Sequence, residues 1–276
     1  MLATGNSGQI MAHVIITGGS SGIGAAIARL CAARGDAVSL IARSYDRLEG
    51  LRAALIDAGA AAVAIEPADV ADADGIAAAI SRLEEAGGPC DLLVTSAGIV
   101  MPGRFDQQPR EDFEDQLQTN LFGTANAVRA VYPGMVARRH GRILMIGSGA
   151  GLIGIHGYSG YCASKAGLVG FAEALRLEAR PFGVSISICF PPDTQTPQLA
   201  AELPLRPAEA KAMIGTAGVM SAEAVASIAL SGADRGRFAI YPGSSMRLLG
   251  LFGSLAKPVL GRWHDRRIAA LGRARR

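Results

Sequence analysis

Cysteine, tryptophan and charged residues are scarce in this chain of 276 residues, which holds four cysteines, one tryptophan and 18% charged residues. The cysteines form no C-x-x-C pair and lie among apolar or small residues. They are therefore predicted to be reduced thiols of a core rather than a disulfide framework or a zinc site. The four histidines show no metal-ligand spacing, so no bound metal is expected. The cysteines are Cys31, Cys90, Cys162 and Cys189.

Signal-peptide and membrane-spanning features are also missing from the sequence. Residues 1–10 carry neither a basic region nor a long apolar stretch. Residues 143–164 lack charge, but their six glycines and interspersed Ser, His and Tyr favour a buried strand followed by a loop. We therefore expect a cytoplasmic protein with a flexible leader over residues 1–10 and an alternative start at Met11.

Positive charge is concentrated at the C-terminal end. Residues 243–276 contain eight Lys or Arg and one acidic residue, whereas the rest of the chain holds 19 basic and 23 acidic residues. This division is unlike that of a uniformly basic protein, and no nucleic-acid partner is expected. Leu, Phe and Trp flanked by Arg and Lys are typical of a segment on an anionic membrane surface. The alternative is a helix that covers a subunit interface, and Pro258 is expected to kink any such helix.

Apolar runs alternate with helical stretches along most of the chain. Half of the residues are apolar, which is typical of a folded α/β protein. Predicted strands cover residues 13–17, 37–41, 61–66, 91–95, 142–147, 184–189 and 237–241, and predicted helices cover 22–34, 44–58, 72–86, 111–138, 158–180 and 221–234. The pattern predicts one Rossmann-type, doubly wound domain over residues 11–242, with a seven-stranded parallel sheet flanked by helices. A basic amphipathic extension follows over residues 243–276.

A glycine-rich loop, T-G-G-S-S-G-I-G over residues 17–24, lies between the first predicted strand and helix. Gly18 permits a tight turn, Gly22 lets the backbone approach a pyrophosphate, and Gly24 allows close packing of helix and strand. The helix N-terminus adds free N–H groups and a positive dipole end. A purely structural turn is the alternative. The residues predicted to bind a dinucleotide here are Gly18, Ser20, Ser21, Gly22, Ile23 and Gly24.

The end of the second predicted strand lacks the acidic residue that would bind a ribose 2′-hydroxyl. It carries Arg43 instead, 19 positions after Gly24, with Arg47 one turn further on. A guanidinium group binds phosphate through two hydrogen bonds. The cofactor is therefore predicted to be NADPH/NADP+ rather than NAD, the alternative being a solvated arginine at a helix start.

Tyr161 and Lys165 are four residues apart on a predicted helix and hence share one face. A phenol has a pKa of about 10, so a nearby cation is needed to stabilise its phenolate. Lys165 is predicted to supply that charge and so to lower the pKa. Ser148, at the end of the fifth predicted strand, is placed to hydrogen-bond the same substrate oxygen.

Taken together, these motifs resemble the short-chain dehydrogenase/reductase family over residues 12–242. The resemblance implies an NADP-dependent oxidoreductase acting on a ketone or alcohol, in which Tyr161 donates the proton and Lys165 also holds the nicotinamide ribose. It further implies that Asn120 positions a water for proton transfer and that the chain forms a homodimer or homotetramer through the 111–138 and 158–180 helices. The family's functional positions fall on the glycine loop and on Asp69, Val70, Ala97, Gly98, Asn120, Ser148, Tyr161 and Lys165.

The sequence departs from the family pattern at two places, after the fourth and after the sixth predicted strand. Thr95 and Ser96 replace two amides after the fourth strand, which is expected to weaken a support of that strand rather than the chemistry. After the sixth strand, P-P-D-T-Q-T-P over residues 191–197 is similar to a segment of the 3-ketodihydrosphingosine reductase subfamily. By that resemblance, Pro191, Thr194 and Thr196 lie beside the nicotinamide. An idiosyncratic turn in another ketoreductase is the alternative, and Asp193 is expected to form the turn.

The resemblance to this subfamily implies reduction of 3-ketodihydrosphingosine to dihydrosphingosine in sphingolipid biosynthesis, at the cytoplasmic face of a membrane. One alternative is a ketoreductase for another lipid-like, steroid or 3-oxoacyl ketone. Residues 197–220, rich in Leu, Met and Ala, are expected to form an apolar lid over such a substrate. Another alternative is a non-catalytic NADPH sensor, which the complete set of catalytic residues disfavours. His156 is a further candidate for substrate contact.

Overall fold

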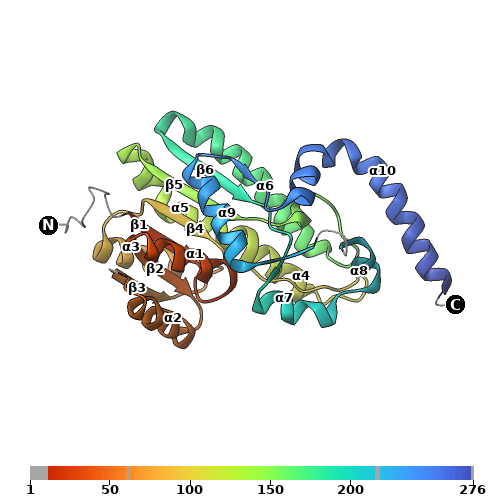
Figure 1. Cartoon of the computed structure of the whole chain (residues 1–276), viewed down its shortest axis with the longest axis horizontal. Helices are drawn as coiled ribbons and strands as arrows, with labels where there is room; N and C mark the ends of the chain where they lie inside the picture. Colours follow the sequence, from red (N-terminus) through yellow and green to blue (C-terminus); the bar gives the residue numbers. More distant parts are fainter. Residues whose placement is uncertain (1–11, 61, 215–217, 275–276) are drawn as a thin grey trace.

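The computed structural model describes residues 12–60, 62–214 and 218–274, so the expected leader and Met11 lie outside the described residues. Seven parallel strands form one sheet in the order β3-β2-β1-β4-β5-β6-β9 (Figure 1). This confirms the predicted α/β fold and its seven-stranded sheet. The strands are β1 (His13–Thr17), β2 (Ala37–Ala42), β3 (Ala62–Pro67), β4 (Leu92–Thr95), β5 (Gly141–Ile146), β6 (Val184–Cys189) and β9 (Ala239–Ile240).

The strand order reverses direction between β1 and β4, which are hydrogen-bonded neighbours. Chain order runs outward through β2 and β3 on one side, and through β5, β6 and β9 on the other. Because the helices that follow β1 and β4 lie on opposite faces of the sheet, a crevice opens at the carboxyl ends of these two strands. The fold therefore places a ligand site there.

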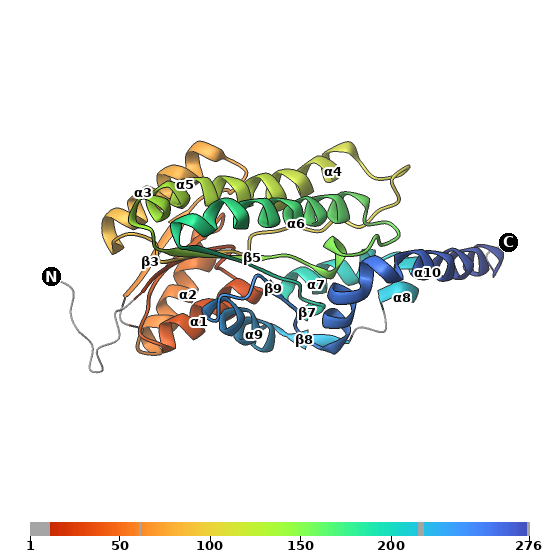
Figure 2. The ribbon, with the colours of Figure 1, turned by 90° about the horizontal axis from the view of Figure 1, so that it is seen from above.

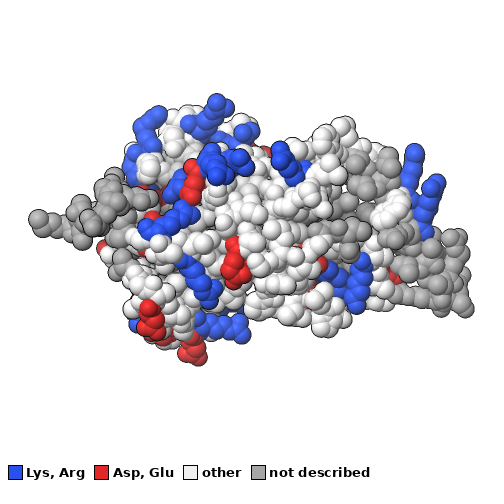
Figure 3. All heavy atoms as spheres, in the orientation of Figure 1, with Lys and Arg blue, Asp and Glu red and all other residues white. Residues whose placement is uncertain are grey.

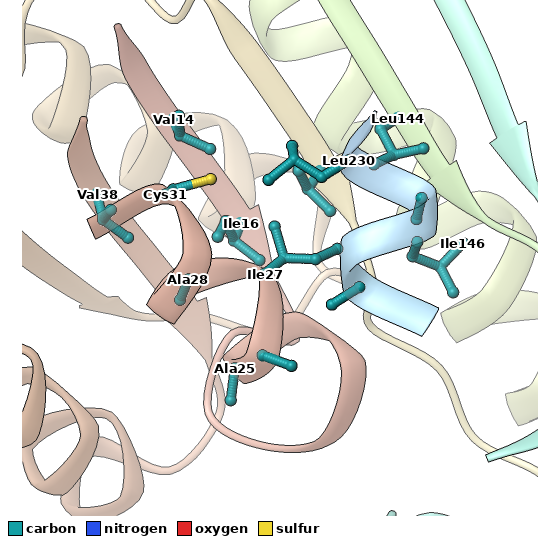
Figure 4. Packing of buried hydrophobic residues seen from close by; sticks show 14 of the residues in the cluster. Val14, Ile16, Ala25, Ile27, Ala28, Cys31, Val38, Leu144, Ile146 and Leu230 are labelled. Carbon is teal, nitrogen blue, oxygen red and sulfur yellow. The ribbon is translucent and has the colours of Figure 1, made fainter. Parts of the chain in front are cut away.

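Helices cover both faces of the sheet (Figure 2). One layer holds α1 (Gly22–Ala33), α2 (Tyr45–Asp57) and α9 (Ala222–Asp234), and the other holds α3 (Ala73–Gly87), α4 (Arg110–Leu117), α5 (Gly123–Arg138) and α6 (Ser159–Ala179). All five residues of β1 are buried, because both of its faces meet a helical layer. Val14 and Ile16 pack with Ile27 of α1 and Leu230 of α9 (Figure 4), while Ile15 joins the core on the opposite face.

The predicted helix over residues 111–138 is wrong at one point, because a five-residue π-helical turn, Gln118–Phe122, separates α4 from α5. A π turn inserts one residue into the helical repeat and is frequent at functional sites. It brings Asn120 inward, and this side chain is fully buried. Helical periodicity alone does not distinguish such a turn from a continuous α-helix.

A second, two-stranded sheet was not predicted. It pairs β7 (Asp193–Gln195) with β8 (Val219–Ser221) in parallel. The described residues between these strands include α7 (Pro197–Glu202) and α8 (Ala208–Ile214), which belong to the segment predicted to form the lid. Short 3₁₀ turns occupy Gly149–Gly151, Arg180–Phe182 and Leu203–Leu205.

The chain described ends in one long helix, α10 (Ser244–Ala274), which extends away from the sheet domain (Figures 1 and 2). Pro258 lies inside it, and the helix bends along its length. Its first turns touch the domain, since Met246 is buried beside the loop after β5. No helix among the described residues is both long and apolar enough to cross a membrane.

Candidate active site

A cavity of about 1570 Å³ opens beyond the carboxyl ends of β1, β4 and β5. Its wall combines the glycine loop, the loops after β2, β4 and β5, the start of α6, the lid and residues of α10 as far as Trp263. Of the residues predicted for the site, all but Gly24 and Asn120 line this one cavity, and Asn120 lies directly behind its wall. The tertiary structure thus brings together segments that are far apart in the sequence.

The glycine loop has the backbone that the sequence predicts. Gly18 and Gly22 both have a positive φ, of 66° and 55°, which L side chains rarely adopt. A Cβ at Gly18 would lie 2.5 Å from the backbone nitrogen of Ala97, so the loop after β1 touches the loop after β4. Gly24 packs against the carbonyl oxygen of Gly18 rather than against a strand. Glycine is needed at positions 18 and 24 because backbone atoms of other residues occupy the space that a Cβ atom would fill.

The N-terminus of α1 faces the cavity. Ser21 is its N-cap residue, but its side chain makes no capping hydrogen bond among the described residues, and no acidic residue lies in the first turn. The first N–H groups of a helix need an external acceptor, and the helix dipole favours an anion there. Together with the absence of a side chain at Gly18 and Gly22, this end of the cavity fits a pyrophosphate.

Arg43 and Arg47 line the cavity directly after β2. Both side chains are exposed, and neither forms an ion pair with any described residue. Ser44, between them, accepts a hydrogen bond from the Arg47 backbone N–H at 3.4 Å and so begins α2. Two guanidinium groups without a carboxylate partner fit a further phosphate at this corner.

Asn120 joins the loop after β4 to α6. Its Oδ1 accepts from the Ile99 N–H at 2.8 Å, and its Nδ2 donates to the Ile99 carbonyl at 2.9 Å and to Ser164 Oγ at 3.0 Å. Ser164 in turn donates to the Tyr161 carbonyl at 2.8 Å. Both hydrogens of the amide nitrogen are therefore used in joining this loop to the helix that carries Tyr161 and Lys165.

Lys165 is buried, with 5% of its surface exposed, and donates to the Ile146 carbonyl at 3.1 Å. Removal from water disfavours the ammonium form, and burial lowers the pKa of Lys165 to about 8. Its Nζ lies 5.8 Å from the centre of the Tyr161 ring. The predicted sharing of one helix face is confirmed by this contact.

Tyr161 and Ser148 meet at the cavity wall. Burial raises the pKa of Tyr161 to about 12, and the hydrogen bond with the Ser148 side chain partly offsets this effect. The predicted lowering of the phenol pKa by Lys165 is therefore not found. Burial has the largest effect on this pKa, and the nearby carboxylates Glu202 and Asp193 raise it further. At neutral pH the phenol keeps its proton, as a proton donor must.

Comparison with known proteins identifies the family of this chain. Residues 12–204 match the short chain dehydrogenase family. The chain belongs to this family. It is 38% identical over 233 residues to a 3-dehydrosphinganine reductase of Danio rerio, which covers 82% of this chain and 70% of the relative. It is 35% identical over 242 residues to a 3-ketodihydrosphingosine reductase of Mus musculus, which covers 86% and 73%.

A solved short-chain dehydrogenase from Sphingobium yanoikuyae, in complex with NADPH, is similar in structure. Its TM-score is 0.77 at 31% identity, over 90% of this chain and 95% of that one. Membership of the short-chain dehydrogenases makes this protein an oxidoreductase acting on a ketone or hydroxyl group. The assignment of individual site residues rests on their geometry in the cavity.

Several secondary predictions about this short-chain dehydrogenase are settled by the structure. Thr95 Oγ1 is buried without a hydrogen-bond partner among the described residues, as expected where a supporting amide is missing. Cys31, Cys90 and Cys189 are buried free thiols, and burial raises the pKa of each. Cys162 is free but only partly buried. His156 is not among the residues that line the cavity.

The prediction for Asp193 is wrong, because this residue begins β7 and forms an ion pair. Arg206 Nη1 lies 2.6 Å from Asp193 Oδ2, and Arg206 Nη2 lies 2.6 Å from Glu202 Oε1. Tyr158 completes the cluster by donating to Glu202 Oε1 at 2.6 Å. The expected apolar lid therefore has a charged inner face.

Sequence analysis missed Tyr158, Glu202 and Arg206 as cavity residues. The only sequence feature that could have indicated this cluster is the four-residue spacing of Glu202 and Arg206, which allows an ion pair on a helix. That spacing occurs on many solvent-exposed helices, whereas here the Arg206 side chain is 5% exposed. Burial of this pair is decided by how the lid folds onto α6 and β7.

Proposed function

We propose that this protein catalyses the NADPH-dependent reduction of 3-ketodihydrosphingosine to dihydrosphingosine. One observation carries the proposal: Tyr161, Ser148 and Lys165 meet in the same cavity as the glycine loop and an unpaired Arg43. Relatives that are 35–38% identical across most of the chain are named for this reaction. The segment over residues 191–197 forms part of the cavity wall and supports the same subfamily.

The cofactor proposed is NADPH, and the residues present fit it. The glycine loop and the α1 N-terminus would hold the pyrophosphate, Arg43 and Arg47 the 2′-phosphate, and Asp69 with Val70 the adenine. Ala97, Gly98, Pro191, Thr194 and Thr196 would hold the nicotinamide side, all of which line the cavity. When bound, NADPH supplies the hydride that reduction of a ketone requires.

Tyr161 is proposed to donate its phenol proton to the ketone oxygen, while Ser148 hydrogen-bonds that same oxygen. A proton donated to an oxygen that has gained negative charge yields the alcohol and leaves a phenolate at Tyr161. The Lys165 ammonium, 5.8 Å from the ring centre, stabilises that phenolate. Asn120 holds α6 in place through its bond to Ser164 and is proposed to position a water for return of the proton.

The size and lining of the cavity suit a lipid-like ketone. Its volume of about 1570 Å³ exceeds the roughly 300–1,000 Å³ common for one drug-sized ligand, so there is room for a dinucleotide and a second molecule. Apolar side chains from the loop after β5, the lid and α10 line the far end: Ile153, Ile155, Leu199, Met213, Leu249 and Phe252. An alkyl chain would be removed from water by this wall.

A membrane surface is the proposed source of that substrate. Leu248, Leu251, Phe252 and Leu255 recur at the i, i+3, i+4 and i+7 positions of α10 and are 64%, 56%, 53% and 80% exposed. Basic side chains are visible at the same end of the molecule (Figure 3), and α10 contains Arg247, Arg262 and Arg266. An exposed apolar stripe with basic neighbours is typical of a helix on an anionic surface. The helix therefore supports peripheral attachment next to the cavity mouth.

Flotation with vesicles tests the attachment. The variant Leu251→Glu/Leu255→Glu changes two exposed residues that do not line the cavity. We expect binding to anionic vesicles to fall at least about tenfold, since each leucine contributes about 1.5–3 kcal/mol when buried. Ile56→Glu, on α2, is the matched control. Unchanged flotation together with a lower mass by light scattering would support the subunit-interface alternative instead.

A homodimer or homotetramer through α4, α5 and α6 is also proposed. Large apolar side chains are exposed on or beside these helices, including Phe105, Phe122 and Leu177 at 73%, 50% and 65%. Exposed apolar patches on one layer are typical of subunit contacts. Light scattering of the wild type and of Phe122→Glu would test this, with a smaller assembly expected for the variant.

Turnover of purified protein tests the main proposal. NADPH oxidation is measured with 3-ketodihydrosphingosine, a steroid ketone and an acetoacetyl thioester. We expect kcat/KM to be highest for the sphingoid ketone. Good turnover of another ketone without turnover of the sphingoid one would assign the protein to a different ketoreductase activity.

A further inference from the structure

The cluster formed by Asp193 of β7 with Glu202 and Arg206 of the lid carries one more negative than positive charge. Asp193 and Glu202 are both paired with Arg206, whose side chain is 5% exposed, while the two carboxylate side chains are 22% and 11% exposed. The other described cations that line the cavity are Lys165 beside Tyr161 and the two arginines after β2. One carboxylate charge of the lid therefore has no counterion of its own within the cluster.

The excess negative charge of this cluster acts on Tyr161, the proposed proton donor. The Tyr158 ring connects the two sites, because it lies 6.3 Å from the Tyr161 ring centre while its hydroxyl is 2.6 Å from Glu202 Oε1. Glu202 and Asp193 both raise the pKa of Tyr161, after burial, which has the largest effect. Proton donation leaves a phenolate at Tyr161, and a neighbouring negative charge opposes that step. A reductase for neutral ketones gains nothing from this arrangement.

Glu202 also has an oxygen available to a ligand. Its hydrogen bonds with Tyr158 and Arg206 all use Oε1. No described residue donates to Oε2, and this atom is not among the buried polar atoms that lack a partner. Since Glu202 lines the cavity, Oε2 can accept a hydrogen bond from a molecule inside it.

We propose that Glu202, with Asp193, forms a cation subsite that binds a primary ammonium group close to the reacting ketone of the substrate. The subsite rests on the proposed function, whose substrate is a long-chain amino ketone, and it assigns recognition of the amino group to these two carboxylates. A bound ammonium cancels the excess charge of the lid and so removes its opposition to the Tyr161 phenolate. Arg206 holds the two carboxylates in place and contacts no substrate.

The test compares two ketones that differ only in the amino group: a medium-chain 2-amino-1-hydroxy-3-ketone and its deamino analogue. For the wild type we expect kcat/KM to favour the amino ketone by about tenfold or more, as for a hydrogen bond between charged groups. Glu202→Gln keeps the Oε1 acceptor but removes the charge, and the ratio should fall close to one. Glu223→Gln, exposed at the start of α9, is the control and should keep the wild-type ratio.

A purely structural role of Glu202 would lower kcat/KM for both ketones in proportion, and an unchanged ratio overturns the subsite while the reductase function stands. If Glu202→Gln does not fold, as judged by its melting temperature, Asp193→Asn removes the same charge and carries the comparison. Binding gives a second readout without turnover. Calorimetry with a medium-chain 2-amino-1,3-diol and its N-acetyl derivative should show a preference of about tenfold for the amine, lost in the variant. That preference without turnover of either ketone would retain the subsite and overturn the proposed function.

Discussion

The nucleotide side and the substrate side of the cavity are built by different kinds of contact. The glycine loop and Arg43 belong to one continuous stretch, β1–α1–β2, and their positions follow from strand-turn-helix geometry. The lid cluster instead joins Tyr158 of the loop before α6 to residues of β7, α7 and the turn after it, up to 48 positions away. The nucleotide side can therefore be predicted from a sequence motif, whereas the contacts of the substrate side form only when the chain folds.

The nucleotide side and the substrate side of the cavity also differ in charge. The nucleotide side presents the N–H groups of a helix N-terminus and guanidinium groups that form no ion pair with any described residue, and both attract phosphates. The lid side presents carboxylates held by a single buried arginine. Tyr161 lines the same cavity, and the lid-side carboxylates Glu202 and Asp193 raise its pKa. Substitutions can therefore separate binding of the nucleotide, binding of the ketone and transfer of the proton.

Tyr161→Phe should have the largest effect, because it removes the proton donor while retaining the ring. We expect kcat to fall by about 10³-fold or more, within the range of general acid catalysis. The affinity for NADPH, measured by fluorescence titration, should stay within about twofold, since a lost proton donor changes chemistry rather than binding. Near-wild-type turnover with NADPH bound would show that another group is the acid.

Arg206→Leu should disrupt only the substrate side. It leaves two carboxylates unpaired, and breaking a buried ion pair costs about 3–5 kcal/mol. Because the cluster holds the lid, we expect faster amide exchange in α7 and a raised KM for the ketone, with unchanged NADPH affinity. Hydrogen exchange read by mass spectrometry measures this. Equal loss of protection in β1 and α1 would show that the two sides are not independent.

Lys165→Met should stabilise the protein while abolishing its activity. Burial lowers the pKa of Lys165 from 10.5 to about 8, so the unfolded chain binds more protons than the folded one between these values. The ionised lysine therefore costs stability below pH 8, by up to about 3 kcal/mol at 1.36 kcal/mol per pKa unit. The cost diminishes as the pH rises from 8 to 10.5.

Chemical denaturation at pH 7 and pH 9.5 tests whether the ionised Lys165 lowers the free energy of unfolding. The gain in unfolding free energy for Lys165→Met should be larger at pH 7 than at pH 9.5. Lys211→Met, on an exposed position of α8, is the control and should show little change at either pH. A variant less stable than wild type at pH 7 would mean that Lys165 is held as a favourable ion in the fold.

Arg43→Ala should have the smallest effect and act only on the nucleotide side. Loss of a charge-assisted contact with a phosphate costs about 1.5–3 kcal/mol, so KM for NADPH should rise about 10- to 100-fold. KM for NADH, which has no 2′-phosphate, should hardly change. Arg52→Ala, on the following helix α2 and paired with Glu49, serves as the control. Equal effects on both nucleotides would place the 2′-phosphate elsewhere.

The two sides also differ in how far the sequence predicts them. The seven strands of the main sheet were predicted within about two residues at their ends, because buried parallel strands form apolar runs that loops interrupt. The π turn at Asn120 was not predicted, because one inserted residue hardly changes the helical periodicity of the sequence. Nor was the two-stranded sheet, whose strands have three residues each and are stabilised by pairing across the lid.

By itself the sequence determined the alternation of strands and helices, the glycine loop and the shared helix face of Tyr161 and Lys165. These features depend on residues within a few positions of one another, where backbone geometry alone sets the spacing. Only the tertiary structure decided the direction of the Tyr161 and Lys165 pKa shifts, the burial of the Arg206 cluster and the place of α10 beside the cavity. Desolvation and Coulomb interactions sum over neighbours from remote segments, so they exist only once those segments have packed together.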